Sequence, residues 1–246
     1  MEKIYFVMPA YNEAENIART IEQWYPVVEQ LNGVGECEAW LVIANDGSRD
    51  NTYELMSAAK KEKQLTHFIP LEKSNGGHGH TVMYLYRYAI EQGADYIFQT
   101  DSDGQTNPEE VWEMLGLRHD YDIQVGNRAH RQDGMARVGV AAVLRMVVWM
   151  FLQVWVADLN TPFRLMESRK LKAITDILPQ DFFLCNAAIT AVSKRWKYRM
   201  RFQDISFVPR KKGTNSINLP KIFGIGWKAV MQFRQLNGIL QRMSPK

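Results

Sequence analysis

Residues 95–110 read DYIFQTDSDGQTNPEE, in which a short apolar run stands directly before an acidic loop and a proline. The apolar run is typical of a buried strand, and the Pro-Glu-Glu at the end is typical of a first helical turn. Asp101 and Asp103 lie two residues apart past the strand, where both carboxylates can reach one hard cation, and Gln105 can add a carbonyl oxygen. An acidic turn that caps the next helix through Asn107 is the simpler alternative.

The same order of strand and helix repeats through the first half of the chain. Apolar runs of strand length occupy residues 3–10, 39–46, 65–71, 95–100 and 121–128, and helix patterns follow the first four. This alternation predicts an α/β fold with a mostly parallel sheet flanked by helices. Ligands bind beyond the carboxyl ends of such strands, so PAYNE (9–13), NDGS (45–48) and DSDGQ (101–105) are expected on one rim. Their convergence favours a cation site over a plain turn.

The composition is that of an ordinary folded protein of 246 residues, with 46% hydrophobic and 23% charged residues. This length suits one large domain or two small ones. Cys37 and Cys185 cannot make a disulfide framework, and no CxxC or Cys/His cluster indicates zinc. The apolar run near the N-terminus is too short for a signal peptide. We therefore expect a reducing, cytoplasmic location.

The charge is divided unevenly along the chain. Residues 1–130 hold 10 Lys/Arg against 21 Asp/Glu, whereas residues 131–246 hold 20 against 6. Solvated surface charge explains many of these residues, but the split also indicates that the second half meets phosphate, a membrane face or nucleic acid. The acidic rim of the first half would repel nucleic acid, so we expect no nucleic-acid partner.

Residues 138–157 form a long apolar stretch whose strongly polar side chains are Arg145 and Gln153. A helix of this length could just cross a hydrocarbon core of about 30 Å. We reject a span, because Arg145 near its middle would cost roughly 2.5–3.5 kcal/mol. The stretch is then either a buried core helix or a helix at a membrane interface.

The remainder of the second half mixes helix and strand patterns. A short strand is expected within residues 160–166 and another within 198–213. Residues 168–178 and 181–196 have helix patterns, and residues 219–240 are expected to form a basic amphipathic helix, broken near Gly224 and Gly226.

Four segments together carry a family resemblance, namely VMPAYNEAENI, IANDGSRDNT, TDSDGQTNPEE and VGNR. In this order and spacing they resemble family 2 glycosyltransferases of the GT-A fold, with most similarity to polyprenyl-phosphate sugar transferases such as dolichyl-phosphate mannose synthases. The resemblance covers roughly residues 3–215. It implies one continuous GT-A domain, with residues 1–130 binding the nucleotide sugar. Residues 131–246 would be the smaller acceptor-binding part, which includes the C-terminal amphipathic helix.

The resemblance also implies roles for residues on the donor side. The nucleotide would be bound by Pro9, Tyr11, Glu13, Asp46 and Asp101. The matching metal-binding residues are Asp101, Asp103 and Gln105, which would hold Mg²⁺ or Mn²⁺. Asn45 stands where the family often has a first aspartate, in the motif DDGS.

On the acceptor side the resemblance implies contacts between arginines and a phosphate. The expected residues are Arg128, Arg137, Arg164 and Arg210, and the expected catalytic set is Asp101, Asp103, Arg128 and Arg210. Thr161 and Pro162 depart from the family pattern Ser-Gly-Phe-Arg, and the loop RKKGTNSIN lacks the lysine that often follows its serine. These departures concern the donor sugar and the acceptor more than the fold.

These roles lead to one main hypothesis, a metal-dependent and inverting transfer of a sugar from a nucleoside diphosphate to a polyprenyl phosphate. An acceptor phosphate is already anionic and needs positioning more than proton removal. The enzyme would then be cytoplasmic, with peripheral contact to the inner face of an anionic membrane as a further expectation.

Two alternatives remain open. A hydroxyl acceptor on a glycan, as in cell-surface polysaccharide synthesis, would need a general base, for which Asp181 and Asp204 are candidates. A non-catalytic protein that binds anionic surfaces would account for the basic second half but not for the acidic rim. His78 and His80 are near a glycine-rich turn, and we interpret them as solvent-facing or close to phosphate rather than as metal ligands.

Overall fold

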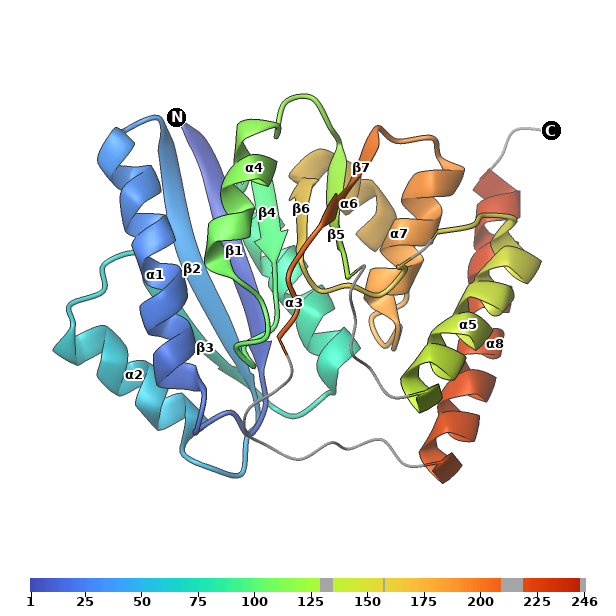
Figure 1. Cartoon of the computed structure of the whole chain (residues 1–246), viewed down its shortest axis with the longest axis horizontal. Coiled ribbons are helices and arrows are strands. Elements are labelled where there is room, and N and C mark those ends of the chain that lie inside the picture. The colour runs from blue at the N-terminus through green and yellow to red at the C-terminus, as the bar shows by residue number, and fades with distance from the viewer. Residues whose placement is uncertain (129–134, 157, 209–218, 244–246) are drawn as a thin grey trace.

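The computed structural model describes all residues except 129–134, 157, 209–218 and 244–246, and the side chains of 135–138, 219–223 and 225 are also left aside. In the described residues one sheet forms the centre, with helices on both faces (Figure 1). Its strands are β1 (Glu2–Ala10), β2 (Cys37–Asp46), β3 (Phe68–Lys73), β4 (Tyr96–Gln99), β5 (Ile123–Asn127), β6 (Arg164–Glu167) and β7 (Met200–Asp204). The order across the sheet is β3-β2-β1-β4-β6-β5-β7.

The strand pairing is mostly parallel, as the sequence predicts. β1 runs parallel to β2 and to β4, and the pairs β2–β3 and β5–β7 are also parallel. The exception is β6, which lies antiparallel between β4 and β5. Strands from both sides of residue 130 therefore belong to the same sheet.

The connecting segments form the helices that cover the sheet. They are α1 (Ile17–Val34), α2 (Thr52–Glu62), α3 (His78–Glu91), the short 3₁₀ helix η1 (Pro108–Glu110), α4 (Val111–Gly116), α5 (Met135–Leu152), α6 (Ser168–Thr175), α7 (Cys185–Arg195) and α8 (Leu219–Met243). Asn107 caps η1, since its side chain accepts a hydrogen bond from the amide of Glu109 at 3.2 Å. The helix start expected after the DSD loop is thus present alongside the two carboxylates.

Two hydrophobic cores lie on opposite faces of the sheet. On one face Trp24 of α1 packs among Phe6, Phe98 and Phe163, with ring centroids between 4.8 and 6.3 Å apart. The other core contains buried residues of α3, α5, α7 and α8. Apolar residues on both faces explain why the strands read as nearly continuous apolar runs.

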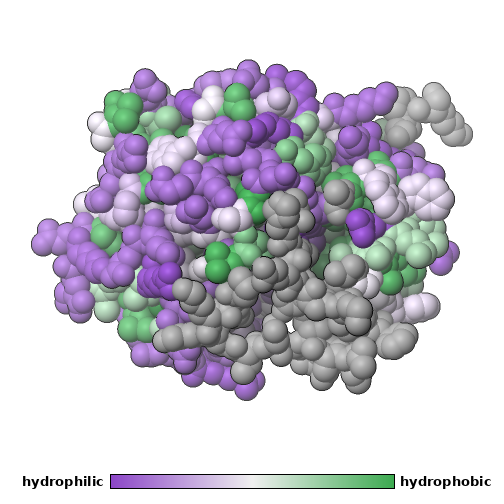
Figure 2. Space-filling view, viewed as in Figure 1, coloured by the Kyte–Doolittle hydropathy of each residue, from purple (hydrophilic) through white to green (hydrophobic). Residues whose placement is uncertain are grey.

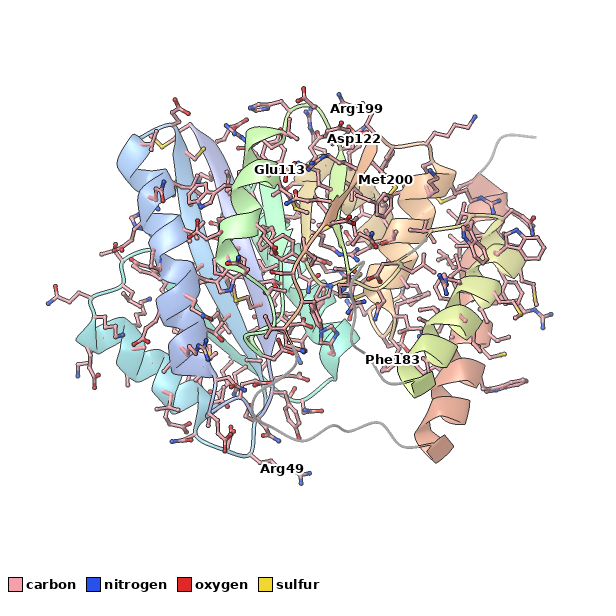
Figure 3. All side chains as sticks on the ribbon, in the orientation of Figure 1. Arg49, Glu113, Asp122, Phe183, Arg199 and Met200 are labelled. Atoms are coloured by element: carbon pink, nitrogen blue, oxygen red, sulfur yellow. The ribbon has the colours of Figure 1, made fainter. Side chains whose placement is uncertain are left out.

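The amino-terminal edge of the sheet is held by a charged pair. Asp122, at the start of β5, accepts hydrogen bonds from the amide of Arg199 at 2.8 Å and from its guanidinium at 2.9 Å. Figure 3 shows this pair on the side of the molecule opposite to Arg49, which follows β2. The carboxyl ends of the strands, where Arg49 lies, are therefore at the other edge.

Helices α5 and α8 pack side by side at the end of the molecule beyond β7 (Figure 1). The expected break near Gly224 and Gly226 is wrong, because α8 runs without interruption from Leu219 to Met243. One side of α5 is buried through Val147, Val148 and Leu152. Within the described ranges no helix is both long enough and apolar enough to cross a membrane.

Candidate functional site

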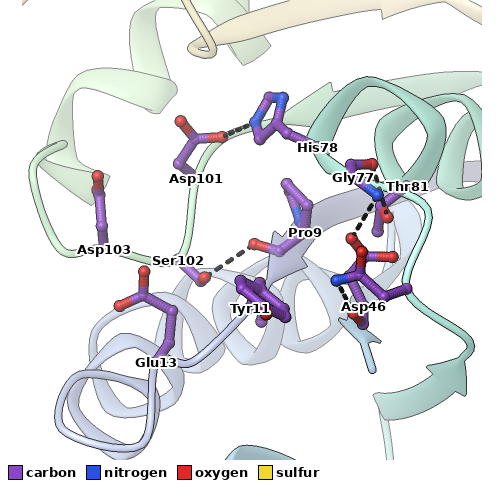
Figure 4. A pocket seen from close by; sticks show the side chains of 12 residues that line it. Pro9, Tyr11, Glu13, Asp46, Gly77, His78, Thr81, Asp101, Ser102 and Asp103 are labelled. Carbon is purple, nitrogen blue, oxygen red and sulfur yellow. Dashed lines mark hydrogen bonds and ion pairs between the residues drawn. The ribbon is translucent and has the colours of Figure 1, made fainter. Parts of the chain in front are cut away.

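A pocket of about 370 Å³, lined mostly by polar residues, opens at the carboxyl edge of the sheet (Figure 4). Its walls come from the segments after β1, β2 and β4 and from the start of α3. This is the rim on which the three polar loops are expected, and each of them contributes to the lining through Tyr11, Asp46 and Asp101. The strand order places β1 between β2 and β4, so the three loops meet there.

The loops after β1 and β2 are fastened to each other by hydrogen bonds. Asn12 adopts a positive φ of 53°, and its amide donates to the hydroxyl of Ser48 at 2.9 Å. The side-chain oxygen of Asn12 accepts from the amide of Arg49 at 2.9 Å. The amide of Glu13 donates to Thr52 at 2.9 Å. These bonds fix the backbone directly after Tyr11, whose side chain is 42% exposed at the pocket.

Asp46 holds the glycine-rich loop in front of α3. Its carboxylate accepts from the Nζ atom of Lys73 at 2.5 Å and from the amides of Gly76 and Gly77 at 2.9 and 2.8 Å. Burial alone raises the pKa of the Asp46 carboxyl, but the bonds from Lys73 and Gly76 outweigh burial and lower this pKa. A nucleotide base that contacted Asp46, as expected, would therefore have to bind a carboxylate that already accepts hydrogen bonds from Lys73, Gly76 and Gly77.

The close approach of two loops explains the glycine after Asp46. Gly47 has a φ of 62°, and a Cβ atom there would lie 2.7 Å from the amide nitrogen of Asn75. The side chain of Asn75 in turn donates to the carbonyl of Asp46 at 2.8 Å. The segment Asp46–Gly47 thus sets the position of residues 75–77 and, through them, the start of α3.

Asp101 and Asp103 stand on one side of the pocket, on the loop that leaves β4 (Figure 4). Between them the hydroxyl of Ser102 donates to the carbonyl of Pro9 at 2.8 Å, and the Ser102 carbonyl accepts from Thr20 at 2.9 Å. These two bonds pin the loop to β1 and α1. The predicted carboxylates therefore come together with the predicted nucleotide residues Pro9, Tyr11, Glu13 and Asp46 in one pocket.

His78 is a site residue whose contact the sequence analysis did not predict. It is the first residue of α3, and its Nε2 atom lies 3.1 Å from Oδ1 of Asp101. Desolvation opposes protonation of His78, but the nearby charges of Asp101, Asp103 and Asp46 prevail and raise the pKa of its imidazole. The sequence feature that could have pointed to His78 is the glycine pair before it, at the start of a helix that follows a strand.

The oxygen ligands in the pocket suit a divalent cation that takes only part of its coordination from the protein. Magnesium often binds through one or two carboxylates and takes water and substrate phosphates as its other ligands. Asp101 and Asp103 can supply those carboxylates. In the part of the chain that the structure describes, no three His, Cys, Asp or Glu side chains are already gathered as a metal centre.

Gln105 lies less favourably for a metal than the sequence predicts. Its Nε2 atom donates to the carbonyl of Val208 at 2.9 Å, and the residue is not part of the pocket lining. The backbone amide of Gln105 donates to the Asp103 carboxylate at 3.2 Å. The structure thus brings Gln105 near Asp103 through the backbone, while its side chain joins the loop after β4 to the segment after β7.

Of the arginines expected at an acceptor phosphate, Arg128 and Arg164 are described, and neither lines the pocket. Arg128 forms a two-pronged ion pair with Asp158, at 2.7 and 2.9 Å, and lies over the ring of Phe207 at 5.1 Å. The side chain of Arg137 and all of Arg210 lie outside the described residues.

Arg164 occupies a buried position. Its exposed fraction is 0%, and its guanidinium donates to the carbonyls of Thr161 and Asn186. Burial lowers the pKa of the Arg164 guanidinium. This position argues against the expected contact with an acceptor phosphate, because the donors are used by backbone carbonyls inside the protein.

The two candidate general bases lie apart from the pocket lining. The side chain of Asp204 accepts a hydrogen bond from Asn127 at 2.7 Å, and the backbone carbonyl of Asp181 accepts from Gln232 at 3.0 Å. Both residues are exposed. This arrangement supplies no base next to Asp101 from either residue.

The mostly parallel sheet, with a pocket beyond the carboxyl ends of its strands, defines an α/β protein of the kind in which ligands bind at that edge of the sheet. Comparison with known proteins narrows this class. Residues 5–145 match the family described as Glycosyl transferase family 2, and the chain belongs to that family.

Curated relatives share the first part of the chain. An undecaprenyl-phosphate 4-deoxy-4-formamido-L-arabinose transferase from Yersinia enterocolitica is 29% identical over 149 residues, which are 60% of this chain and 43% of that protein. The transferase of the same description from Serratia proteamaculans is 26% identical, over 60% of this chain and 44% of that protein. The aligned part of the chain thus spans less than half the length of these relatives.

Solved structures share the fold over nearly the whole chain. Glucosyl-3-phosphoglycerate synthase from Mycobacterium tuberculosis, in complex with Mn²⁺ and UDP-glucose, has a TM-score of 0.67 at 15% identity, covering 96% of this chain and 79% of that one. Mannosyl-3-phosphoglycerate synthase from Rubrobacter xylanophilus has a TM-score of 0.66 at 12% identity, covering 99% and 76%. The chain therefore has the GT-A fold.

Proposed function

We propose that this protein is a metal-dependent glycosyltransferase that moves a sugar from a nucleoside diphosphate to a polyprenyl phosphate, with inversion at the sugar. The observation that carries the proposal is the meeting of Asp101 and Asp103 with the loops after β1 and β2 in one pocket. The family supports the reaction class. The relatives named as undecaprenyl-phosphate transferases support the acceptor class.

The donor would lie across the rim of the sheet. Pro9, Tyr11 and Glu13 would border the base and ribose, with Tyr11 free to offer its ring to the base because it is 42% exposed. Asp46 would act mainly by keeping the loop before α3 in place. The diphosphate would then lie between that loop and Asp101.

The residues around the diphosphate would control its departure. Asp101 and Asp103 would hold the divalent cation, Mg²⁺ or Mn²⁺. When bound, that ion supplies positive charge that offsets the charge of the departing nucleoside diphosphate. The imidazole of His78, next to Asp101, would donate a hydrogen bond to a phosphate oxygen and orient the Asp101 carboxylate.

A phosphate acceptor agrees best with the surroundings of the pocket. Its oxygen is already anionic, so the attack on the sugar needs alignment and charge screening rather than proton removal. Arg128, Arg137 and Arg210 remain our proposed acceptor contacts, and Arg128 would exchange Asp158 for the incoming phosphate. A hydroxyl acceptor would require a base that neither Asp181 nor Asp204 offers at the observed positions.

A lipid-linked acceptor would place the reaction at a membrane surface, on the cytoplasmic side where nucleotide sugars are supplied. The basic second half of the chain supports peripheral contact with an anionic membrane.

The test measures transfer from a panel of radiolabelled UDP-, GDP- and dTDP-sugars to undecaprenyl phosphate, with and without Mn²⁺. We expect metal-dependent transfer that is lost in Asp101→Ala and in Asp103→Ala, while both variants keep the wild-type circular dichroism spectrum. Asp120→Ala is the matched control, because Asp120 is an exposed acid that precedes β5 at the opposite edge of the sheet. Full transfer by the Asp101→Ala/Asp103→Ala variant would refute the proposed metal role.

A further inference from the structure

Helix α5 presents an apolar face to solvent. Val143, Met146, Trp149 and Met150 follow helical spacing and are 50%, 56%, 51% and 55% exposed. Their neighbours on the other side of the helix are buried in the core. Large apolar side chains at this exposure, gathered on one helix face, mark an interaction surface rather than scattered surface residues.

Helix α8 extends this apolar surface. Trp227 is 70% exposed and Met231 is 50% exposed, one helical turn apart. Because α5 and α8 pack side by side, the two exposed stripes belong to one end of the molecule, where Figure 2 shows apolar side chains gathering on the right. We call the set Val143, Met146, Trp149, Met150, Trp227 and Met231 the α5/α8 face.

The charged side chains that α5 and α8 themselves carry have one sign. Lys228, Arg234 and Arg242 are exposed on α8, and the sequence contains no Asp or Glu from residue 205 to residue 246. Residues 139–157 contain none either. An apolar surface edged by cations and containing tryptophan has the character of a helix pair that lies in the headgroup region of an anionic bilayer.

We propose that the α5/α8 face docks this protein onto an anionic lipid bilayer, with both helices lying along the membrane surface. A second copy of the chain is a poorer occupant. A two-fold pairing through the same face would bring the cations of one copy, Lys228, Arg234 and Arg242, against the cation-bearing face of the other, without acidic residues of these segments to compensate. Anionic lipid headgroups supply the opposite charge that the face lacks.

Helix α8 is connected to the start of α3, which borders the pocket, through Phe183. The amide of Phe183 donates to the side chain of Gln232 on α8 at 3.0 Å, and the Nζ atom of Lys228 lies 5.3 Å from the centre of the Phe183 ring. On the other side, the carbonyl oxygen of Phe183 would lie 2.4 Å from a Cβ atom at Gly79. Gly79 follows His78, which contacts Asp101.

This connection gives the docking face a role in the proposed reaction. A bilayer against α8 would lie near the residues that border the start of α3, so the phosphate of a membrane-anchored acceptor could reach the pocket while its tail stayed in the lipid. This role rests on the proposed function, whereas docking itself rests on the exposed apolar residues and the surrounding cations.

The first experiment is co-sedimentation of the full chain with vesicles of phosphatidylcholine alone or with about 30% phosphatidylglycerol. We expect binding to the anionic vesicles that weakens with salt. Trp149→Gln/Met150→Gln/Trp227→Gln should reduce this binding at least about ten-fold. Lys228→Gln/Arg234→Gln/Arg242→Gln should remove its salt dependence. Val34→Gln is the control, because Val34 is 64% exposed at the end of α1.

The outcomes separate the occupants of the face. Failure of the wild-type chain to bind anionic vesicles at low salt would overturn the proposal. So would a stable dimer in light scattering that the apolar triple variant converts to a monomer. Retained vesicle binding by a folded triple variant would also overturn it, with folding checked by its thermal unfolding midpoint.

A second assay keeps this proposal separate from the proposed function. A short-chain isoprenyl phosphate, soluble without vesicles, should be glycosylated equally by the wild type and by the apolar triple variant. With undecaprenyl phosphate in anionic vesicles, the apolar triple variant should transfer the sugar more slowly than the wild type. Vesicle binding without transfer to either acceptor would refute the proposed function and leave docking supported. Transfer to both acceptors without vesicle binding would refute docking and leave the proposed function supported.

Discussion

The Nε2 atom of His78 lies 3.1 Å from Oδ1 of Asp101, joining the first turn of α3 to the loop that leaves β4. This contact exists because Asp46 and Lys73 hold residues 76 and 77 in front of α3. The side of the pocket assigned to the diphosphate is therefore built by a loop whose position depends on a buried ion pair.

His78→Ala should lower kcat by about 10²-fold, since it removes a donor directed at the developing charge of the leaving group. His78→Gln should recover part of the loss, because a glutamine amide can still donate. Steady-state kinetics with a saturating acceptor would measure both variants. Equal kcat values for His78→Ala and the wild type would contradict the role.

Lys73→Met should destabilise the protein by about 3 kcal/mol, because it leaves the buried carboxylate of Asp46 without its cation. The side chains of Lys73 and Asp46 are only 11% and 4% exposed. Lys63→Met is the matched control, since the Lys63–Glu22 pair is 48% and 58% exposed and should contribute less than about 1 kcal/mol. Urea unfolding measures both changes. An equal loss of unfolding free energy in the two variants would show that burial of the Lys73–Asp46 pair does not add to its contribution to stability.

Asp122→Asn should lower stability near neutral pH and lose this effect in acid. Burial raises the pKa of the Asp122 carboxyl, but the hydrogen bonds from Arg199 outweigh it and hold this pKa below its usual value. The stability that the carboxylate contributes is therefore fully present above the unfolded pKa of about 3.9 and is lost as the pH falls through the lower folded value.

Unfolding midpoints of Asp122→Asn and the wild type between about pH 7 and pH 2 would check this dependence. The two curves should converge at the acid end. A constant separation over the whole range would show that the carboxylate charge is not the cause.

Gly79→Ala should destabilise the protein by about 1–3 kcal/mol and slow turnover, because the new methyl group would collide with the carbonyls of Phe182 and Phe183. Gly238→Ala is the control. Gly238 lies inside α8 with nothing within 4 Å of its would-be Cβ atom, so alanine should stabilise the helix by up to about 1 kcal/mol. Thermal unfolding and kcat together test the pair. A Gly79→Ala variant as stable and active as the wild type would contradict the tight packing seen here.

Much of the fold follows from local patterns in the first half. The apolar runs predict β1, β2 and β4 closely, because strands covered on both faces need apolar residues at nearly every position. The place of Asp101 and Asp103 follows as well, since the end of a parallel strand fixes the rim on which the next loop lies.

Features that depend on distant contacts could not be predicted in the same way. The pairing of His78 with Asp101 requires the loop held by Asp46, which is 31 residues from Gly77 in the sequence. The burial of Arg164 depends on carbonyls of Thr161 and of Asn186, in α7. The apolar sequence of α5 fits a core helix and an interfacial helix equally well. Only the packing of α8 against α5 shows which side of α5 is buried.

The antiparallel strand β6 has a consequence for how the chain folds as it is made. β6 lies between β4 and β5, although it is synthesised about 40 residues after β5. Until Arg164–Glu167 leaves the ribosome, β4 keeps one unpaired edge and β5 has no partner on either edge, so both can take up a strand from another chain. A nascent chain that stops at residue 130 is therefore expected to aggregate, whereas one that extends beyond β7, which pairs with the other edge of β5, can complete its own sheet.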